Sequence, residues 1–331
     1  MGRLKSAAAL ALGLALLGLA ARDAAPERVL AALGSAQVSW LLVALALDAG
    51  VFALKSLKWR FVFLPVARLP LSTFFSGIAV GALSNTLLPL RLDEVVRSFY
   101  FGVRTGVPKA TVLGTILVER LVDATTLLAA MALLVGFYAG PASPAYAIPV
   151  LLALLSTGAA SLALLAWKPD SVERFLAGAG RAGALAGVRS RLAAGLAVLG
   201  PLRLASLFAF AAAEWLVATL HVAAALRAFD VALPFMGNLA VVTSGYLGFA
   251  LPSAPGGLGV YDLLVKTSLT RGFSLDPSTA LSCTLVLHAL LVVPVSLAGA
   301  VILARDGLSL SRLRAMATRP ADAPGAEAHE H

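Results

Sequence analysis

Charged side chains are scarce in this sequence. Asp, Glu, Lys and Arg make up only 13% of the 331 residues, whereas 60% of the residues are hydrophobic. A soluble domain of this length could not bury so much apolar surface, so the composition excludes that class and predicts a membrane protein. Each bilayer span needs about 20 apolar residues, and the length therefore allows roughly eight to ten passes.

Cysteine is almost absent as well. Cys283 is the single cysteine, so an internal disulfide is excluded. His, Cys and Asp residues do not occur at the spacing of a metal site. The sequence also lacks a Walker loop, a GxSxG elbow and an aspartate-rich nucleotide-sugar motif. We therefore expect no metal, no cofactor and no self-contained enzyme.

The basic residues follow a topological pattern. They flank apolar runs and do not alternate with aromatic residues on a polar face, so nucleic acid is not an expected partner. Segments 1–5, 55–70, 168–203 and 305–319 carry two, four, six and four Lys or Arg, whereas segments 22–37, 137–146 and 227–237 carry two, none and one. Because basic loops stay in the cytoplasm, both termini are expected there, with the chain in the inner membrane of a bacterium or archaeon.

Six apolar runs have the length of ordinary membrane spans. They are Leu4–Ala21, Val38–Leu54, Thr111–Gly136, Ala145–Trp167, Leu204–Leu226 and Thr279–Leu303. Two further apolar stretches, 71–104 and 238–271, are interrupted by proline, glycine or charged residues near their middles. Neither can form one straight helix, so each is expected to be a re-entrant or broken-helix hairpin.

The expected orientation makes the two hairpins enter from opposite faces, the first from the cytoplasm and the second from outside. The order span, span, hairpin, span then occurs twice with reversed direction, which is the inverted-topology repeat of many secondary transporters. The predicted fold is an all-α polytopic membrane protein with repeats at 1–140 and 141–304. The Arg-rich segment 168–200 is expected to be a cytoplasmic linker, and 305–331 a disordered cytoplasmic tail.

The second interruption is rich in glycine. Gly256, Gly257 and Gly259 permit positive φ and the close approach of another group to the backbone. A helix starting near Val260 would point its positive end at this position, where an anion is the natural guest. We therefore take the glycines and the following Asp262 as candidate substrate-binding residues, while the alternative is that the glycines serve only to turn the chain.

Charged residues surround the start of the helix that follows the first interruption. Arg91 precedes this helix, Asp93 and Glu94 fall in its first turn, and Arg97 lies about one turn further on. A guanidinium binds phosphate with two hydrogen bonds, so Arg91 and Arg97 are the expected headgroup ligands. The alternatives are that the acids only complement the helix dipole and that Arg97 pairs with Asp93.

Further ionisable residues lie inside apolar spans, among them Asp48, His221 and His288 as well as four candidate site residues. Glu119, Arg120 and Asp123 share one span, where facing lipid would be costly, so they must face the bundle. They could bind substrate, relay protons or lock the first hairpin in place. Glu214 has no partner along its own helix, so we expect it to pair across helices, with an arginine of the first hairpin as a candidate.

Several motifs resemble the transmembrane region of the lysylphosphatidylglycerol synthase family, the lipid-flippase part of the multiple peptide resistance factors and their stand-alone relatives. The resemblance covers residues 5–305. It is carried by Lys58-Trp-Arg60, Asn85-Thr-Leu-Leu-Pro89, Glu94-Val-Val-Arg97, Val118-Glu-Arg-Leu-Val-Asp123 and Pro255-Gly-Gly-Leu-Gly-Val-Tyr-Asp262. It implies a lipid-handling membrane domain. The 331 residues show no counterpart of the family's aminoacyl-transferring soluble domain, so synthase activity is not expected.

These observations favour a flippase-like lipid translocase or lipid-binding transporter for an anionic phospholipid or a polyprenyl-phosphate-linked lipid. The two hairpins would meet near the midplane, with Arg91, Arg97 and Arg120 around the headgroup. Two alternatives stay open: a non-transporting scaffold that presents lipid to a glycosyltransferase or synthetase, and a transporter of a small anionic solute. A lipid with an anionic headgroup, a lipid-modifying enzyme and a second copy of the chain are the candidate partners.

Overall fold

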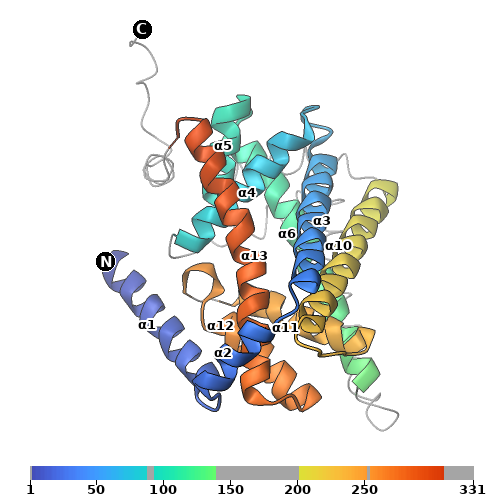
Figure 1. The fold of residues 1–331 in the computed structure, drawn as a ribbon. Helices are drawn as coiled ribbons and strands as arrows, with labels where there is room; N and C mark the ends of the chain where they lie inside the picture. The colour runs from blue at the N-terminus through green and yellow to red at the C-terminus, as the bar shows by residue number, and fades with distance from the viewer. Residues whose placement is uncertain (1, 88–92, 139–200, 252–253, 309–331) are drawn as a thin grey trace, which may run out of the picture.

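The computed structural model describes residues 2–87, 93–138, 201–251 and 254–308, and these residues form helices without any strand. The helices are α1 (Gly2–Ala21), α2 (Pro26–Ser35), α3 (Val38–Phe63), α4 (Leu71–Leu87), α5 (Asp93–Thr105), α6 (Lys109–Tyr138), α10 (Pro201–Arg227), α11 (Phe235–Ala250), η1 (Pro255–Gly257), α12 (Val260–Thr267), η2 (Ser268–Gly272) and α13 (Pro277–Arg305) (Figure 1). The expected span Ala145–Trp167, the expected linker 168–200 and Arg91 lie outside the described residues.

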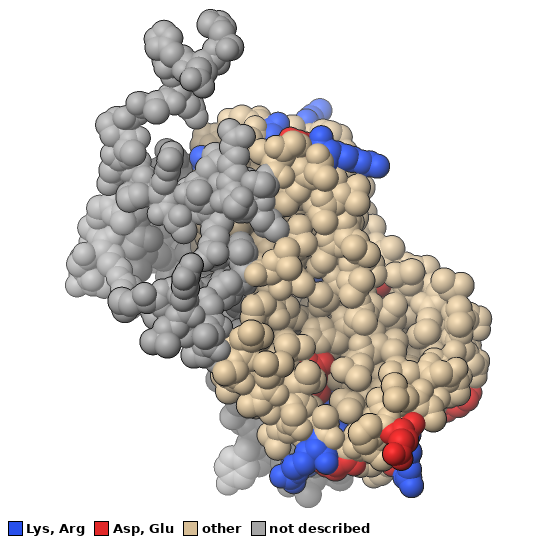
Figure 2. Space-filling view, turned by 60° about the vertical axis from the view of Figure 1, so that its left-hand side comes forward, with Lys and Arg blue, Asp and Glu red and all other residues tan. Residues whose placement is uncertain are grey.

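Within the described residues, four helices are long and apolar enough to cross a membrane. They lie at Val38–Phe63, Thr111–Tyr138, Leu202–Arg227 and Pro277–Arg305. The helical residues before the bend at 22–25 and α2 pass the same test as a pair, with an angle of 84° between them. In the space-filling view, Lys, Arg, Asp and Glu gather at two ends of the molecule, and the surface between them is almost free of charge (Figure 2).

Each of the two interrupted stretches contains two helices that pack against each other. In the first stretch α4 packs on α5, and in the second α11 packs on α12. A Cβ atom on Gly248 of α11 would lie 2.7 Å from the Cα of Tyr261, so only glycine permits this approach. The helix starts also fall where expected, since α5 begins with Asp93 and Glu94 in its first turn and α12 begins at Val260.

Helices α3 and α10 pack side by side and run antiparallel. The backbone N–H of Gln37, just before α3, donates to Ala228 O at 2.8 Å, just after α10. Further along, His221 Nδ1 donates to Ala44 O at 2.9 Å, and Lys58 contacts Glu214. Early residues of one helix therefore meet late residues of the other.

Helices α4 and α13 form a second antiparallel pair. Thr86, near the end of α4, shares a 3.0 Å hydrogen bond with the hydroxyl of Ser296. At Gly299, one turn later in α13, an added Cβ atom would lie 2.3 Å from the carbonyl oxygen of Ala79 and 3.0 Å from the Cβ of Leu83. The backbones are therefore in close contact over about a turn of each helix.

The helices fall into two sets with matching contacts. In the set α3 to α6, α3 packs on α4 and α6, α4 on α5, and α5 on α6. In the set α10 to α13, α10 packs on α11 and α13, α11 on α12, and α12 on α13. Between the sets, α4 packs on α13 and α11 packs on α6. Exchanging each helix of one set for its counterpart therefore leaves the pattern of contacts unchanged.

The two interrupted stretches extend inward from opposite ends of the molecule (Figure 1). At one end Tyr100 of α5 donates to Asp306, which follows α13, at 2.6 Å. At the other end Lys266 of α12 pairs with Asp23, in the bend between α1 and α2, at 3.5 Å. Between these ends, a Cβ atom on Gly256 would lie 3.8 Å from the Cα of Thr86, so the inner tips of the two stretches are in contact.

One sequence prediction about α3 is wrong. The second span was expected to end at Leu54, which placed Lys55, Lys58 and Arg60 in a cytoplasmic loop. Helix α3 instead continues to Phe63, because the aromatic rings after Leu54 pack into the core and keep the chain helical. Lys58 has no exposed surface. These bases therefore lie on a helix and give no loop charge for an orientation rule, which leaves the orientation of the termini a prediction.

Candidate functional site

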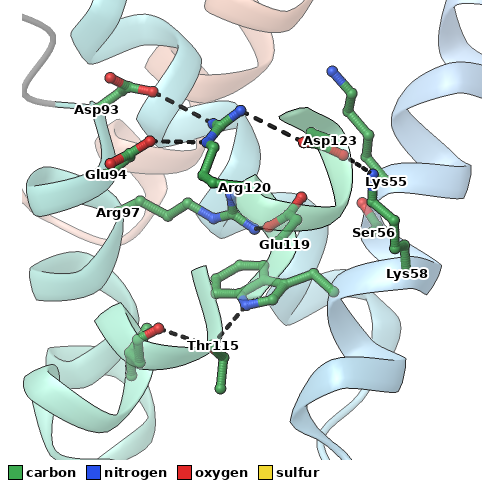
Figure 3. Close-up of polar contacts among 12 residues, drawn as sticks. Lys55, Ser56, Lys58, Asp93, Glu94, Arg97, Thr115, Glu119, Arg120 and Asp123 are labelled. Carbon is green, nitrogen blue, oxygen red and sulfur yellow. Dashed lines mark hydrogen bonds and ion pairs between the residues drawn. The ribbon is translucent and has the colours of Figure 1, made fainter. Parts of the chain in front are cut away.

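An acid–base network connects α3, α5 and α6 (Figure 3), and Glu214 extends it to α10. Arg120 Nε lies 2.8 Å from Glu94 Oε1, and its terminal nitrogens lie 3.7 Å from Asp93 Oδ2 and 3.7 Å from Asp123 Oδ2. Lys58 Nζ donates to Asp123 Oδ1 at 2.5 Å and to Glu214 Oε2 at 2.7 Å. The members of this network are Lys55, Lys58, Asp93, Glu94, Arg97, Glu119, Arg120, Asp123 and Glu214.

The network contains five carboxylates and four basic groups, so its charges nearly cancel. Burial differs sharply across it. The side chains of Lys58 and Glu214 are 1% and 4% exposed, whereas those of Arg120 and Glu94 are 43% and 42% exposed. The buried Lys58–Glu214 pair is therefore part of the packed interior of the bundle. The Arg120–Glu94 pair is the open side of the network, where a partner could be exchanged.

Arg97 belongs to the buried side. Its Nη2 donates to Glu119 Oε2 at 2.7 Å, and its guanidinium lies 3.5 Å from the ring centroid of Trp59. The indole Nε1 of Trp59 in turn donates to Thr115 Oγ1 at 3.0 Å. A cation stacked on an aromatic ring away from water is stabilised by about 2 kcal/mol or more. This geometry favours a structural role for Arg97, which joins α5 to α6, over the expected role of headgroup ligand.

Arg120, the base of the open pair, lies well inside a membrane-length helix. Arg120 is eleven residues beyond the first residue of α6, which has 30 residues. At 1.5 Å per residue this places it about 16 Å along the helix. A half-exposed charge at that depth would be costly against lipid tails, so water or a polar headgroup must adjoin it.

A second polar cluster lies at residues 254–259, which we call the glycine turn. Gly259 N donates to Asp262 Oδ2 at 2.9 Å, which links the turn to the first turn of α12. His288 of α13 bridges Gly256 in the turn and Asp262 in α12, with its Nε2 2.8 Å from Gly256 O and its Nδ1 2.8 Å from Asp262 Oδ1. The ring of Tyr261 packs on the imidazole, with centroids 4.5 Å apart. Asp262 is therefore already fully engaged by its own chain.

Packing around the glycine turn explains its composition. Gly256, Gly257 and Gly259 have φ values of 70°, 80° and 84°, which side chains rarely adopt. A Cβ atom on Gly259 would lie only 2.1 Å from the carbonyl oxygen of Gly13 in α1. A Cβ atom on Gly257 would meet the ring of Phe249 at 2.7 Å. Close packing at Gly257 and Gly259 favours the structural alternative for these two glycines.

The two sets of helices carry corresponding polar pairs of opposite polarity. In the first set the base is Arg97 on α5 and the acid is Glu119 on α6. In the second set the acid is Asp262 on α12 and the base is His288 on α13. Each pair joins a short helix of an interrupted stretch to the long helix that follows it.

The structure brings most of the predicted site residues into these two groups. The acid–base network holds Asp93, Glu94, Arg97, Glu119, Arg120, Asp123 and Glu214. The second group holds Gly256, Gly257, Gly259 and Asp262.

The sequence interpretation missed Lys58 as a site residue. Glu214 does pair across helices, but its partners are Lys58 and, at 3.5 Å, Lys55, and not the arginine that we expected. A signal was present, since four acids (Asp48, Glu119, Asp123 and Glu214) lie inside predicted spans with one arginine among them, which indicates a further buried cation.

The sequence was compared with family models and with curated proteins. The family model described as lysylphosphatidylglycerol synthase TM region matches residues 6–299. No curated protein matches the chain.

Proposed function

Because the chain belongs to the lysylphosphatidylglycerol synthase TM region family, as its motifs predicted, we propose that it binds a lipid with an anionic headgroup and moves it between leaflets without chemical change. It is a multi-pass membrane protein. An anionic phospholipid and a polyprenyl-phosphate-linked lipid share the phosphate that this proposal requires. The inner membrane, with both termini in the cytoplasm, is part of the proposal.

The observation that carries the proposal is the half-exposed ion pair between Arg120, inside the α6 span, and Glu94, at the start of α5. A phosphate can replace the Glu94 carboxylate and bind the Arg120 guanidinium through two parallel hydrogen bonds. The exchange suits the charge of the network, which has one carboxylate more than it has basic groups. When Glu94 swings away, the four bases face four remaining acids, and the phosphate supplies the charge that Glu94 removed.

Arg120 is therefore the headgroup ligand that we propose ahead of Arg97. The Arg97 guanidinium could bind a headgroup only by leaving both Glu119 and the Trp59 ring. Asp93 and Asp123, both 3.7 Å from Arg120, hold the guanidinium in position through longer contacts while the near partner changes.

A route between leaflets is supported by the two sets of helices. Equivalent helices α3 and α10 are antiparallel, and the interrupted stretches extend inward from opposite ends until Thr86 meets Gly256. Both features are expected of inverted repeats, which we propose for this fold. Rocking of one repeat against the other would open the midplane site alternately to each side.

The test uses the full chain in phosphatidylcholine vesicles that contain a trace of fluorescent phosphatidylglycerol. Dithionite added outside destroys the fluorophore only in the outer leaflet, so continued loss of fluorescence measures movement from the inner leaflet. A labelled polyprenyl phosphate serves as a second probe. Bound lipid is measured in parallel by native mass spectrometry of the purified protein.

We expect Arg120→Gln to slow movement and reduce bound lipid by about 10- to 150-fold, because charge-assisted hydrogen bonds contribute roughly 1.5–3 kcal/mol. Glu94→Gln should increase bound lipid, because Arg120 loses its competing carboxylate. Arg271→Gln is the matched control, since Arg271 is exposed in η2 and should leave both readouts unchanged. Bound lipid that depends on Arg120 without movement would instead favour a scaffold that presents lipid to an enzyme. If the purified protein neither moves lipid nor binds it, the proposal is overturned.

A further inference from the structure

His288 makes two hydrogen bonds that restrict where its protons can be. Its Nε2 lies 2.8 Å from Gly256 O, and a carbonyl oxygen can only accept, so Nε2 must carry a hydrogen. Its Nδ1 lies 2.8 Å from Asp262 Oδ1, and this contact also needs a hydrogen between the two atoms. That hydrogen resides either on an imidazolium facing a carboxylate or on a carboxylic acid facing a neutral imidazole. In both cases the pair holds one proton more than neutral histidine plus carboxylate.

Loss of that proton breaks one of the two contacts. A neutral imidazole has one N–H, so it can donate to Asp262 or to Gly256 but not to both. Hydrogen bonds to a charged acceptor contribute about 1.5–3 kcal/mol, whereas neutral ones contribute about 0.5–1.5 kcal/mol. The remaining N–H therefore goes to the Asp262 carboxylate, and the bond to Gly256 is lost. Deprotonation thus releases Gly256, in the middle of the glycine turn, from its hydrogen bond to α13, while Gly259 stays bonded to Asp262.

The glycine turn is placed where its release would matter. Its three residues with positive φ can change conformation without a side-chain penalty. The turn contacts Thr86, at the inner tip of the first interrupted stretch, and Gly13 of α1. A change in the conformation of the turn would therefore alter the contact between Gly256 and Thr86, where the two proposed repeats meet.

We propose that the Asp262–His288 pair is a proton-coupling site, which binds one proton when the glycine turn is docked on α13 and releases it to water when the turn undocks. The proposal rests on the proposed function, to which it adds protons as the coupling ion. His288 is a positioning residue here, because it acts on lipid only through the turn.

Among the described residues, few other ionisable groups surround His288. Asp262 and Tyr261, both on α12, are in contact with it. Helix α4, which packs on α13, has no ionisable side chain, and α2 brings Arg28 only to Asp276, before α13 begins. Tyr246 of α11 and Asp48 of α3 interact electrostatically with Tyr261. The proton therefore belongs to the Asp262–His288 pair.

Asp262→Asn is the decisive variant. The Asn amide can donate to Nδ1 of a neutral imidazole while its oxygen still accepts from Gly259 N, so all three hydrogen bonds persist without a titrating proton. The variant therefore keeps the turn docked when the imidazole is neutral, as it is when the pH rises. His288→Gln removes titration from the other partner. His221→Gln is the matched control, because His221 is also a buried span histidine but bonds only a carbonyl, Ala44 O.

The first experiment measures hydrogen exchange of the backbone amides at 256–259 in purified protein as a function of pH, corrected for the intrinsic exchange rate. In the wild type and in the His221→Gln variant, protection should fall at least about tenfold as pH rises through the titration of the pair, which is the factor for about 1.4 kcal/mol. In Asp262→Asn it should stay high. Protection that is independent of pH in the wild type, or that changes with pH equally in Asp262→Asn, would overturn the proposal.

The second experiment imposes a pH difference across the vesicles of the lipid-movement assay. The wild-type rate should change with the size and direction of the difference, and the Asp262→Asn and His288→Gln rates should not. Lipid movement that ignores the pH difference in the wild type would refute coupling while leaving the proposed function intact. Absence of movement in every vesicle would refute the proposed function, and the exchange experiment would still decide whether the turn is linked to a proton.

Discussion

Replacement of Lys58 by methionine tests whether the centre of the acid–base network is assigned correctly. Methionine keeps the length and the apolar stem of the lysine but removes its charge. The carboxylates of Glu214 and Asp123 then lose the cation that lies 2.7 and 2.5 Å away. Glu214, whose side chain is only 4% exposed, is left as a buried acid with one distant partner.

The expected magnitude follows from burial. Breaking a buried ion pair by removing one partner destabilises a protein by about 3–5 kcal/mol. Lys55 stays 3.5 Å from Glu214 and compensates in part, so we expect the lower end, about 3 kcal/mol. This corresponds to a change of about 150-fold in the unfolding equilibrium. Reversible unfolding by SDS in mixed micelles would measure the free energy of unfolding.

Two companion variants make the result interpretable. Lys55→Met removes a charge that is 22% exposed and makes only the longer contact, so it should cost no more than about 1 kcal/mol. Adding Glu214→Gln to Lys58→Met removes the uncompensated carboxylate and should restore at least about 1 kcal/mol. If Lys58→Met and Lys55→Met agree within about 0.5 kcal/mol, Lys58 is not the buried centre of the network and the reasoning fails.

Two further predictions use the same unfolding assay. Gly259→Ala places a Cβ atom 2.1 Å from Gly13 O at a φ of 84°, so it should destabilise the protein by about 2–6 kcal/mol. Gly272→Ala is the control and should be near neutral, because an added Cβ atom there meets nothing within 4 Å. Equal effects of the two variants would contradict the packing of α1 on the turn. Asp276 caps α13, and the hydrogen bonds from the backbone N–H groups of Thr279 and Ser278 hold its pKa below the ordinary 3.8. The contribution of this cap to the stability of the protein is therefore present above pH 3.8 and is lost as pH falls through the lowered pKa. Asp276→Ala should therefore cost about 1 kcal/mol at neutral pH and less in acid, while Asp276→Asn should cap nearly as well, and a pH-independent difference between the wild type and Asp276→Ala would refute this explanation.

Local signals in the sequence predicted the element boundaries that depend on local physics. Acids at Asp93 and Glu94 complement a helix start, and α5 begins there. Glycines before Val260 cannot continue a helix easily, and α12 begins at that residue. The family was also identified correctly from short motifs.

Partners across the bundle could not be predicted in the same way. Arg97 had an acid four residues earlier on its own helix, yet its 2.7 Å partner is Glu119, because α5 packs on α6 with Trp59 beneath the guanidinium. Burial of Lys58 likewise depends on α10 bringing Glu214 to α3. A single sequence gives the charges and their spacing along a helix, but which helices face each other is decided by packing over the whole chain.

The opposite polarity of the two corresponding ion pairs has a consequence for how each half responds to pH. Arginine keeps its proton at any physiological pH, so the Arg97–Glu119 pair is a permanent latch. Histidine gains and loses a proton near neutrality, so the Asp262–His288 pair is a latch that acidity can close. Two halves with the same helix contacts thus differ in whether their ion pair can gain or lose a proton. In the proposed coupling, protonation therefore changes the half that contains α12 and α13 and leaves the Arg97–Glu119 pair of the other half unchanged.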